Sequence, residues 1–297
     1  MIALLPLLAW LVLVCAEEEE FISGHAFSQL ATFNADARYK TNFNPHAAIK
    51  NGDSIFMNCG HRVLPNFLNQ LNRLPSKGNK YVFITHNCDH SFTSASMHQL
   101  DKYASRIYAI NNVCGEACYP LVQSIPLGFI DSKNHADKAH HVFIDTAKMK
   151  YEKEHLLFMN FMVNNNVARR APCQRAFQGK PWVLSHESGL APGETYTFTA
   201  KSKYVVSPPG AGIDCHRIYE AIYLDAIPIL ESSLLDHFYK HWPVIIVDQW
   251  DEITEEYLAS NYEEHRKALD GWKLKYSNWT KAEFWLNSGN LGPFGEY

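Results

Sequence analysis

The sequence predicts an α/β fold in two halves, with parallel sheets covered by helices in each half. Short segments rich in β-branched and aromatic residues alternate with longer amphipathic segments, which is the pattern of strand–helix–strand units. The chain has 297 residues, 46% of them hydrophobic, which is enough for one large or two medium cores. A polar stretch over residues 131–155 separates two sets of strands and helices. We therefore expect domains over residues 21–145 and 150–275, followed by a tail over residues 276–297.

The first sixteen residues, MIALLPLLAWLVLVCA, form an apolar segment directly before four glutamates. A membrane span usually needs about twenty apolar residues, so residues 1–16 are short for a span and fit the core of a signal peptide. Three interpretations stay open: a cleaved signal peptide, an uncleaved short anchor and a buried N-terminal helix. The first places the protein in the secretory pathway, in the Golgi or ER lumen or secreted. Membrane contact is expected only if the segment is an uncleaved anchor.

Seven cysteines are present, and six remain if Cys15 leaves with the signal peptide. An even number in a secretory chain allows up to three disulfides. Cys114 and Cys118 are close enough in the sequence to pair locally. Ordinary buried thiols are the alternative interpretation.

Short apolar segments are predicted to be strands and longer amphipathic segments to be helices. The predicted strands are Ser54–Asn58, Lys80–Thr85, Arg106–Asn111, Leu156–Phe161, Trp182–Ser185, Tyr204–Ser207, Ile227–Leu230 and Val244–Val247. The predicted helices are Leu64–Leu74, Ser94–Ser105, Asp214–Leu224 and Glu252–Leu269.

The stretch SPPGAGIDCHRIYEAIYLDAIPIL, from Ser207 to Leu230, is the segment most indicative of a binding site. The preceding KYVV has the composition of a buried strand, and PPGAG must end that strand because proline cannot donate to a ladder. Asp214 is then well placed to cap a helix, whose buried side is marked by Ile218 and Ile222. A strand, a glycine loop and a helix N-terminus together bind anions, because free N–H groups and the helix dipole point at the loop.

Arg217 and Glu220 are three residues apart in this helix and project from a similar face. An arginine fork suits two phosphate oxygens, and a carboxylate one turn further accepts hydrogen bonds from vicinal hydroxyls such as those of a ribose. The pair would therefore fit a nucleoside diphosphate. The alternative is an intrahelical ion pair on a solvated face.

The same segment carries a family resemblance. YVVSPPGAGIDCHRIYEAIYLDAIPILESS resembles the C-terminal motif of exostosin-like glycosyltransferases, and WPVIIVDQWDEIT resembles the strand and helix that follow it in that family. YVFITHNCDHSF and IPLGF, in the first half, are similar to segments of the same broad group. The resemblance implies a GT-B fold, with two Rossmann-like domains whose parallel sheets face a central cleft. It also implies that the C-terminal domain binds a nucleotide sugar, expected to be a UDP-sugar, and that the N-terminal domain faces the acceptor.

The resemblance implies that Arg217 contacts the diphosphate of the donor and that Glu220 contacts its ribose. His216 is expected to face the sugar or a phosphate, with a capping or packing role as the alternative. The residues expected to shape the loop beneath the donor are Ser207, Gly210, Gly212 and Asp214.

A second loop, in NFMVNNNVARR, follows the first strand of the second half. Asn164, Arg169 and Arg170 are candidates to reach the phosphates from this facing loop. Two adjacent arginines also suit a solvated face, so that interpretation stays open.

The loop THNCDH follows a strand of the first half and offers Asp89 and His86 as catalytic residues. An acceptor hydroxyl that attacks an anomeric carbon needs a general base within hydrogen-bond reach. The alternative is a turn in which Asn87 and Asp89 bond the local backbone.

The sequence contains no Asp-x-Asp motif, which metal-dependent glycosyltransferases usually carry. Arginine, backbone N–H groups and the helix dipole would then stabilise the leaving diphosphate, so we expect neither a metal nor a cofactor. No His-Glu-x-x-His motif is present either, which disfavours a metal hydrolase.

The function predicted is therefore transfer of a sugar from a nucleotide-sugar donor to a hydroxyl of a glycan or glycoprotein acceptor. The alternative is a catalytically inactive nucleotide-binding, glycan-binding or scaffold protein of the same fold. The net charge of −4 gives no reason to expect nucleic acid as a partner.

Overall fold

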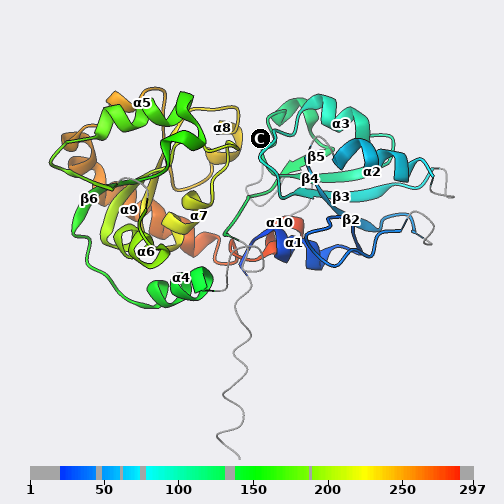
Figure 1. The fold of residues 1–297 in the computed structure, drawn as a ribbon, viewed down its shortest axis with the longest axis horizontal. Coiled ribbons are helices and arrows are strands. Elements are labelled where there is room, and N and C mark those ends of the chain that lie inside the picture. Colours follow the sequence, from blue (N-terminus) through cyan, green and yellow to red (C-terminus); the bar gives the residue numbers. More distant parts are fainter. Residues whose placement is uncertain are drawn as a thin grey trace, which may run out of the picture.

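The computed structural model describes residues 21–44, 49–60, 63–73, 78–130, 138–186 and 189–287. It has two α/β halves side by side, each built on one sheet of five parallel strands (Figure 1). The fold class predicted from the sequence is confirmed. The proposed signal peptide or anchor, residues 1–16, lies outside the described residues.

The sheet of the N-terminal half has the strand order β1-β2-β3-β4-β5. Its strands are β1 (Phe33–Asn34), β2 (Ser54–Asn58), β3 (Tyr81–His86), β4 (Ala104–Ala109) and β5 (Val122–Ser124). Helices α2 (Val63–Leu71) and α3 (Ser94–Leu100) cover one face, and α1 (Gly24–Leu30) and α10 (Ala282–Asn287) cover the other (Figure 1). A 3₁₀ helix, η1 (Gly115–Cys118), lies between β4 and β5.

The sheet of the C-terminal half has the order β10-β9-β8-β6-β7. Its strands are β6 (His155–Asn160), β7 (Val183–His186), β8 (Ser202–Val206), β9 (Ile227–Glu231) and β10 (Ile245–Val247). The direction of strand order reverses between β6 and β8, which makes that point a topological switch. Open α/β sheets bind ligands outside the carboxyl ends of the strands at such a point.

The helices of the C-terminal half connect these strands. They are α4 (Lys138–Lys148), η2 (Val163–Asn165), α5 (Val167–Phe177), α6 (Pro192–Lys201), α7 (His216–Tyr223), α8 (Asp236–Tyr239), η3 (Trp250–Glu252) and α9 (Glu255–Lys275). Helix α4 lies inside the polar stretch that the sequence analysis treated only as a boundary, and it packs on α6.

Two predicted helices have different limits in the structure. The predicted helix Ser94–Ser105 is too long, because α3 ends at Leu100 and β4 begins at Ala104. The helix has ended by Tyr103, because the carbonyl of Tyr103 accepts a hydrogen bond from the N–H of Tyr81 at the start of β3. Helix α9 starts at Glu255 rather than Glu252, because the Thr254 side chain accepts from the N–H of Tyr257 and caps it there.

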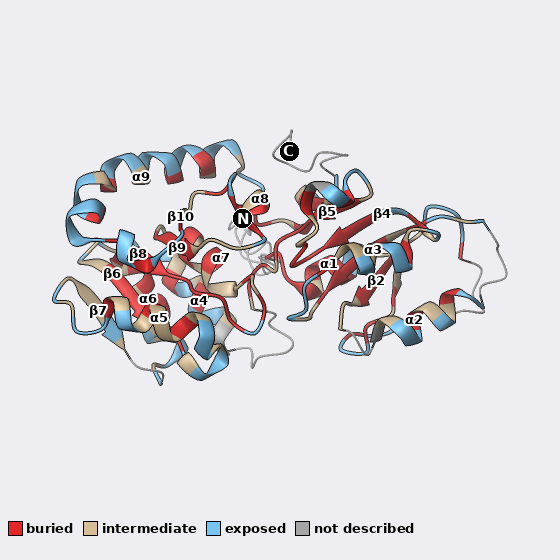
Figure 2. Cartoon of the chain, turned by 90° about the horizontal axis from the view of Figure 1, so that it is seen from above, coloured by how far each residue is buried: buried red, intermediate tan, exposed pale blue. Residues whose placement is uncertain are grey.

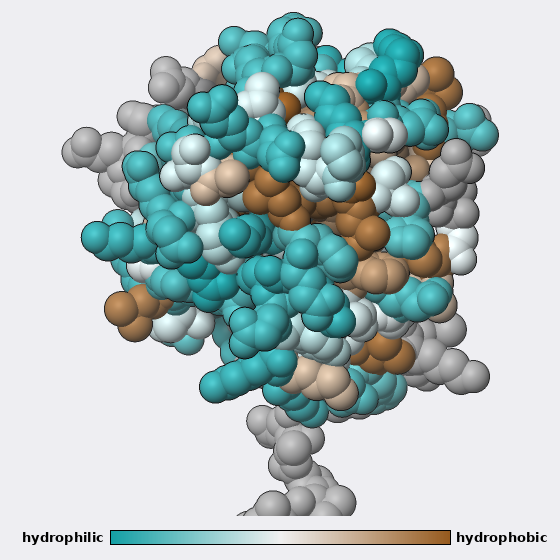
Figure 3. All heavy atoms as spheres, turned by 90° about the vertical axis from the view of Figure 1, so that its left-hand side faces the viewer, coloured by the Kyte–Doolittle hydropathy of each residue, from teal (hydrophilic) through white to brown (hydrophobic). Residues whose placement is uncertain are grey.

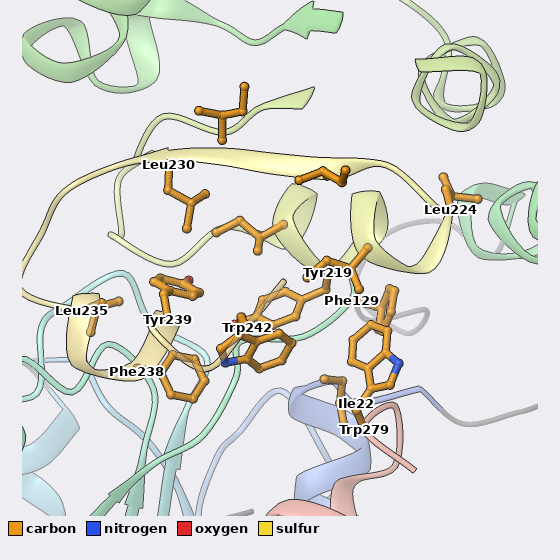
Figure 4. Packing of buried hydrophobic residues seen from close by; sticks show 14 of the residues in the cluster. Ile22, Phe129, Tyr219, Leu224, Leu230, Leu235, Phe238, Tyr239, Trp242 and Trp279 are labelled. Atoms are coloured by element: carbon orange, nitrogen blue, oxygen red, sulfur yellow. The ribbon is translucent and has the colours of Figure 1, made fainter. Parts of the chain in front are cut away.

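A single apolar cluster joins the two halves (Figure 4). Ile22, Phe129 and Trp279 meet in it beside Tyr219 of α7 and Trp242. The end of the described chain thus returns to the N-terminal half, where Trp285 is fully buried. Its carbonyl accepts from the Gln123 side chain, and the hydroxyl of Tyr108 donates to the carbonyl of Leu286.

Burial follows the sheets, since their strands are largely buried while the outward face of α9 is exposed (Figure 2). The outer face of the C-terminal half is mostly hydrophilic, with small separate apolar patches (Figure 3). Of the helices described, none is long and apolar enough to cross a membrane.

Two disulfides are present, Cys59–Cys88 and Cys114–Cys118, and the local pairing predicted for the second is confirmed. Cys173 and Cys215 are free thiols. Structural disulfides persist in oxidising compartments, so this pair of bonds indicates an environment of the secretory type.

Candidate functional site

A cleft of about 470 Å³ lies between the two halves, at the carboxyl ends of strands from both sheets. Each wall is formed by loops that follow strands, which is where parallel sheets bind ligands. The lining residues of the N-terminal half are Gly24, Arg38, His86, Asn87, Cys88, Asp89, Leu127, Phe129 and Ile130. Those of the C-terminal half are Asn165, Arg170, Thr195, Thr199, Gly210, Ala211, Gly212, Asp214, Cys215, His216, Arg217 and Glu220.

The glycine loop after β8 forms one wall, and its glycines are required for close approach. A Cβ on Gly210 would lie 3.0 Å from Nη2 of Arg170, and a Cβ on Gly212 would lie 3.3 Å from Cα of Asp89. Gly212 therefore lets the loop after β8 lie against Asp89, in the loop after β3. Ser207, at the base of the loop, is buried and does not line the cleft.

Asp214 is buried and connects the loop to both halves. Its carboxylate accepts hydrogen bonds from the N–H of Leu127 at 2.9 Å and from the hydroxyls of Tyr219 and Tyr239, both at 2.6 Å. Its own N–H donates to Oδ1 of Asn111 at the end of β4. Burial raises the pKa of this carboxyl, and the hydrogen bonds from Tyr219, Tyr239 and Leu127 oppose that rise.

The prediction that Asp214 caps the helix was wrong. Helix α7 begins at His216 with Cys215 at the N-cap position, and no side chain caps it. The Asp214 carboxylate instead accepts from the N–H of Leu127 and from the hydroxyls of Tyr219 and Tyr239. Asp214 thus positions the start of α7 through these bonds.

Arg217 and Glu220 both line the cleft, as the helical spacing predicted. The guanidinium of Arg217 lies 6.0 Å from the ring centroid of Phe161, and that of Arg170 lies 5.6 Å from the same ring. The ion pairs among the described residues do not include one between Arg217 and Glu220. The geometry therefore does not favour the intrahelical ion pair, and Arg217 presents its charge to the cleft.

His216, the first residue of α7, makes a contact across the halves. Its Nδ1 lies 2.7 Å from the carbonyl oxygen of Gly128, so the ring donates there. This is the packing role that the sequence analysis left open, although the ring also borders the cleft.

Glu220 is the most strongly perturbed carboxyl that lines the cleft. Burial raises its pKa to about 7, against the opposing effects of the Arg217 charge and a hydrogen bond from Tyr196 of α6. In the folded protein, Glu220 thus changes charge near neutral pH rather than near pH 4.5.

This pKa predicts a pH-dependent affinity for a ribose-containing ligand. An ionised carboxylate can accept from both hydroxyls of a ribose. If Glu220 holds the ribose of UDP, affinity for UDP should rise about tenfold from pH 6 to pH 8, following a single titration near 7. Isothermal titration calorimetry over that range measures the effect.

Glu220→Gln is the matched control, because the ligand's phosphate still titrates but residue 220 does not. The variant should lose the part of the pH dependence that belongs to Glu220. An identical pH profile in both proteins would contradict contact between Glu220 and the ligand.

The structure does not bring Asn164 and Arg169 into this cleft. Asn164 borders a separate hollow beside β7, and Arg169 is ion-paired to Glu231 at 3.0 Å. Their sequence neighbours Asn165 and Arg170 line the cleft instead. The cause is local: the Asn166 side chain caps α5 by accepting from the N–H of Arg169, and this fixes which arginine turns inward.

Arg170 is buried and supports the glycine loop. Its Nε donates to the carbonyl of Pro209 and its Nη1 to the carbonyl of Met162, both at 2.9 Å. The side chain therefore joins the loop after β6 to the loop after β8, on the two sides of the switch point.

The loop His86–Asp89, at the end of β3, is fixed by a disulfide and by hydrogen bonds to several other segments. The Cys59–Cys88 disulfide fixes it to the end of β2, and Asn58 donates to the carbonyl of Asn87 at 2.9 Å. Arg38 donates to the same carbonyl and pairs with Asp36 at 3.2 Å. Asn87 itself has a φ of +63°, a strained left-handed conformation that these bonds maintain.

His86 and Asp89 have different surroundings. His86 is buried, with Nδ1 3.0 Å from Oδ1 of Asn87 and Nε2 3.3 Å from the carbonyl of Pro126. Burial lowers its pKa to about 4. At neutral pH the ring therefore carries one N–H and donates to one of these two oxygens. His86 is buried beneath the loop, whereas the exposed Asp89 borders the cleft and is the candidate base.

Several cleft residues were missed by the sequence analysis. Arg38 lies in an irregular segment and Thr195 and Thr199 lie on α6, which was not predicted as a helix. The Pro-Gly-Glu at the start of α6 was an available signal, because Pro192 takes the first helical position and Glu194 bonds the N–H of Ala191.

Within the described part of the chain, no group of three or more histidine, cysteine or acidic side chains is arranged to hold a metal ion. The arginine and acidic side chains that line the cleft are Arg38, Arg170, Arg217, Asp89, Asp214 and Glu220.

Comparison with known proteins gives distant structural likenesses. No family model and no curated protein sequence matches the chain. Among solved structures, an α,α-trehalose-phosphate synthase (UDP-forming) from Burkholderia vietnamiensis superposes with a TM-score of 0.46 at 10% identity, over 86% of this chain and 74% of that one. A likeness of this extent assigns no function, and it does not show membership of the exostosin-like family.

The two sheets, the cleft between them and the switch point define a two-domain α/β protein of the GT-B type. What this chain binds and does is inferred from the residues of the cleft.

Proposed function

We propose that this protein is a glycosyltransferase that moves a sugar from a nucleotide-sugar donor, expected to be a UDP-sugar, to a hydroxyl of a glycan or glycoprotein acceptor. The observation that carries the proposal is the position of Arg217 and Glu220 on successive turns of α7, facing the cleft behind a glycine loop. The loop lies at the switch point, and the helix N-terminus beside it favours an anion. The two disulfides support a place in the secretory pathway.

The proposed reaction is attack by the acceptor oxygen on the anomeric carbon. The new C–O bond forms there as the bond to the diphosphate oxygen breaks, and the nucleoside diphosphate leaves with the bonding electrons. Asp89 takes the proton of the attacking hydroxyl from the opposite wall of the cleft. Arg217 and the dipole of α7 at its N-terminus stabilise the charge that develops on the leaving diphosphate, without a metal.

The contact between Gly212 and Asp89 brings the two proposed substrate sites together. The backbone of Asp89 lies against Gly212, so the candidate base borders the donor loop directly. A sugar attached to a diphosphate at the start of α7 would therefore lie next to the Asp89 carboxylate.

Calorimetric titration with UDP, CDP, GDP and ADP in the presence of EDTA tests the proposal. Wild type should bind at least one of them, and Arg217→Ala should weaken that binding about 100-fold, since a charge-assisted fork to phosphate contributes about 2–3 kcal/mol. Arg175→Ala is the control, because Arg175 is an exposed arginine on α5 that does not line the cleft. A folded wild type that binds no nucleotide would sink the proposal.

One observation favours a second candidate, a nucleotide-binding protein without turnover. His86 is buried, so of the two residues predicted to be catalytic Asp89 alone is exposed at the cleft. Nucleotide binding with no release of nucleoside diphosphate from any donor, at any acceptor, would favour this candidate.

A further inference from the structure

Helix α6 forms a wall of the cleft to which no role has yet been given. Thr195 and Thr199 line the cleft from this helix. Tyr196, the neighbour of Thr195, bonds to Glu220, so this part of α6 lies directly against the residue proposed to hold the ribose.

The hydroxyl oxygen of Thr195 acts as a hydrogen-bond acceptor within the protein. Its oxygen lies 3.2 Å from Nδ2 of Asn160, at the end of β6, and therefore accepts from that amide. A hydroxyl has one hydrogen to donate, and among the described residues none accepts the hydrogen of Thr195. Thr195 therefore offers the cleft one oriented donor.

Thr199, one turn further along α6, differs in this respect. Its hydroxyl donates at 2.8 Å to the backbone carbonyl of Thr195, four residues earlier. Its hydrogen is thus used within the helix, and Thr195 is the threonine of this wall that can donate to a ligand.

The order of groups along a nucleotide places its base on this wall. The diphosphate lies at the start of α7 beside Arg217, and the ribose lies one turn further at Glu220. The next group along the ligand is the base, and the next surface beyond Glu220 is α6 at Thr195 and Thr199.

We propose, resting on the proposed function, that Thr195 donates a hydrogen bond to a ring carbonyl of the base and selects a uridine nucleotide. At the exocyclic position of its ring, uracil presents the acceptor oxygen O4, whereas cytosine and adenine present an amino group that donates. A single donor facing that position therefore favours uracil over both. Asn160 acts as a positioning residue, because its amide turns the Thr195 hydrogen toward the ligand.

The test compares the dissociation constants of UDP and ADP by calorimetry, for wild type and Thr195→Val. Wild type should prefer UDP, and valine, which keeps the shape but lacks the hydroxyl, should reduce the UDP-to-ADP preference about tenfold, as one lost hydrogen bond of about 1.4 kcal/mol implies. Thr195→Ser should keep the preference. Asn160→Ala should reduce it part of the way.

Thr197→Val is the matched control, since Thr197 lies on α6 but outside the lining of the cleft; it should leave the preference unchanged. An equal loss of UDP and ADP affinity in Thr195→Val would overturn the inference, because the hydroxyl would then not read the base. So would a wild type that prefers ADP. Either result leaves the proposed function standing, whereas no binding of any nucleotide by folded wild type removes the proposed function itself.

Discussion

Asp89→Asn should lower the rate of sugar transfer by about 100-fold or more, since a positioned general base typically contributes about 10²–10⁴-fold. The amide keeps the size of the side chain but cannot take the acceptor proton. Asp89 is exposed at the cleft, and its backbone lies against Gly212, so the substitution leaves the packing of the loop intact. Release of nucleoside diphosphate under saturating donor and acceptor measures the rate.

Nucleotide affinity separates this effect from damage to the donor site. Asp89→Asn should bind UDP as wild type does, because Arg217 and Glu220 lie on the opposite wall. Asp248→Asn, an exposed aspartate elsewhere in the C-terminal half, is the control for loss of a surface charge. Full transfer activity in Asp89→Asn would remove Asp89 from the mechanism.

Asp214→Ala should lower the melting temperature by about 10 °C. The change leaves two buried hydroxyls and the N–H of Leu127 without their acceptor, which costs about 3–5 kcal/mol for a buried charged partner, at about 2–4 °C for each kcal/mol. Thermal unfolding followed by circular dichroism measures the shift.

Tyr239→Phe is a graded companion to Asp214→Ala. It removes one of the donors and leaves Asp214 bonded to Tyr219 and Leu127, so its loss should be about 1 kcal/mol. If Asp214→Ala melted with wild type, the aspartate would not be the connection between the halves that the hydrogen bonds indicate.

The sequence predicted most of the strands because buried parallel strands are short apolar runs bounded by turn residues. It also predicted that Arg217 and Glu220 share a face, since helical spacing alone sets that relation. The strand order was not predictable in the same way. Parallel strands pair across long connections. β6 pairs with β7 on one side and with β8 on the other, and the local sequence of β6 does not indicate the second of these neighbours.

The parts of the site that were missed depend on contacts between distant segments. Asp214 was predicted to cap α7, but its carboxylate is used by Leu127, Tyr219 and Tyr239 instead. Arg38 reaches the cleft from an irregular segment without any periodic signal. The choice between Arg169 and Arg170 depends on where α5 begins, and Asn166 decides it through one hydrogen bond.

The return of the chain end to the N-terminal half restricts how the cleft can open. The chain passes from one half to the other after β5 and again after α9. Ile22 is hydrogen-bonded to both connecting segments: its carbonyl accepts from the N–H of Phe129, and its N–H donates to the carbonyl of Thr280. Because the two connecting segments lie side by side, they oppose separation of the halves. The motion that they resist least is rotation of one half relative to the other about an axis through these segments. Such a rotation widens the cleft only if the bonds that join Asp214 to Asn111 and Leu127, and His216 to Gly128, open. Opening of the cleft is therefore coupled to the contacts that hold the start of α7 in place.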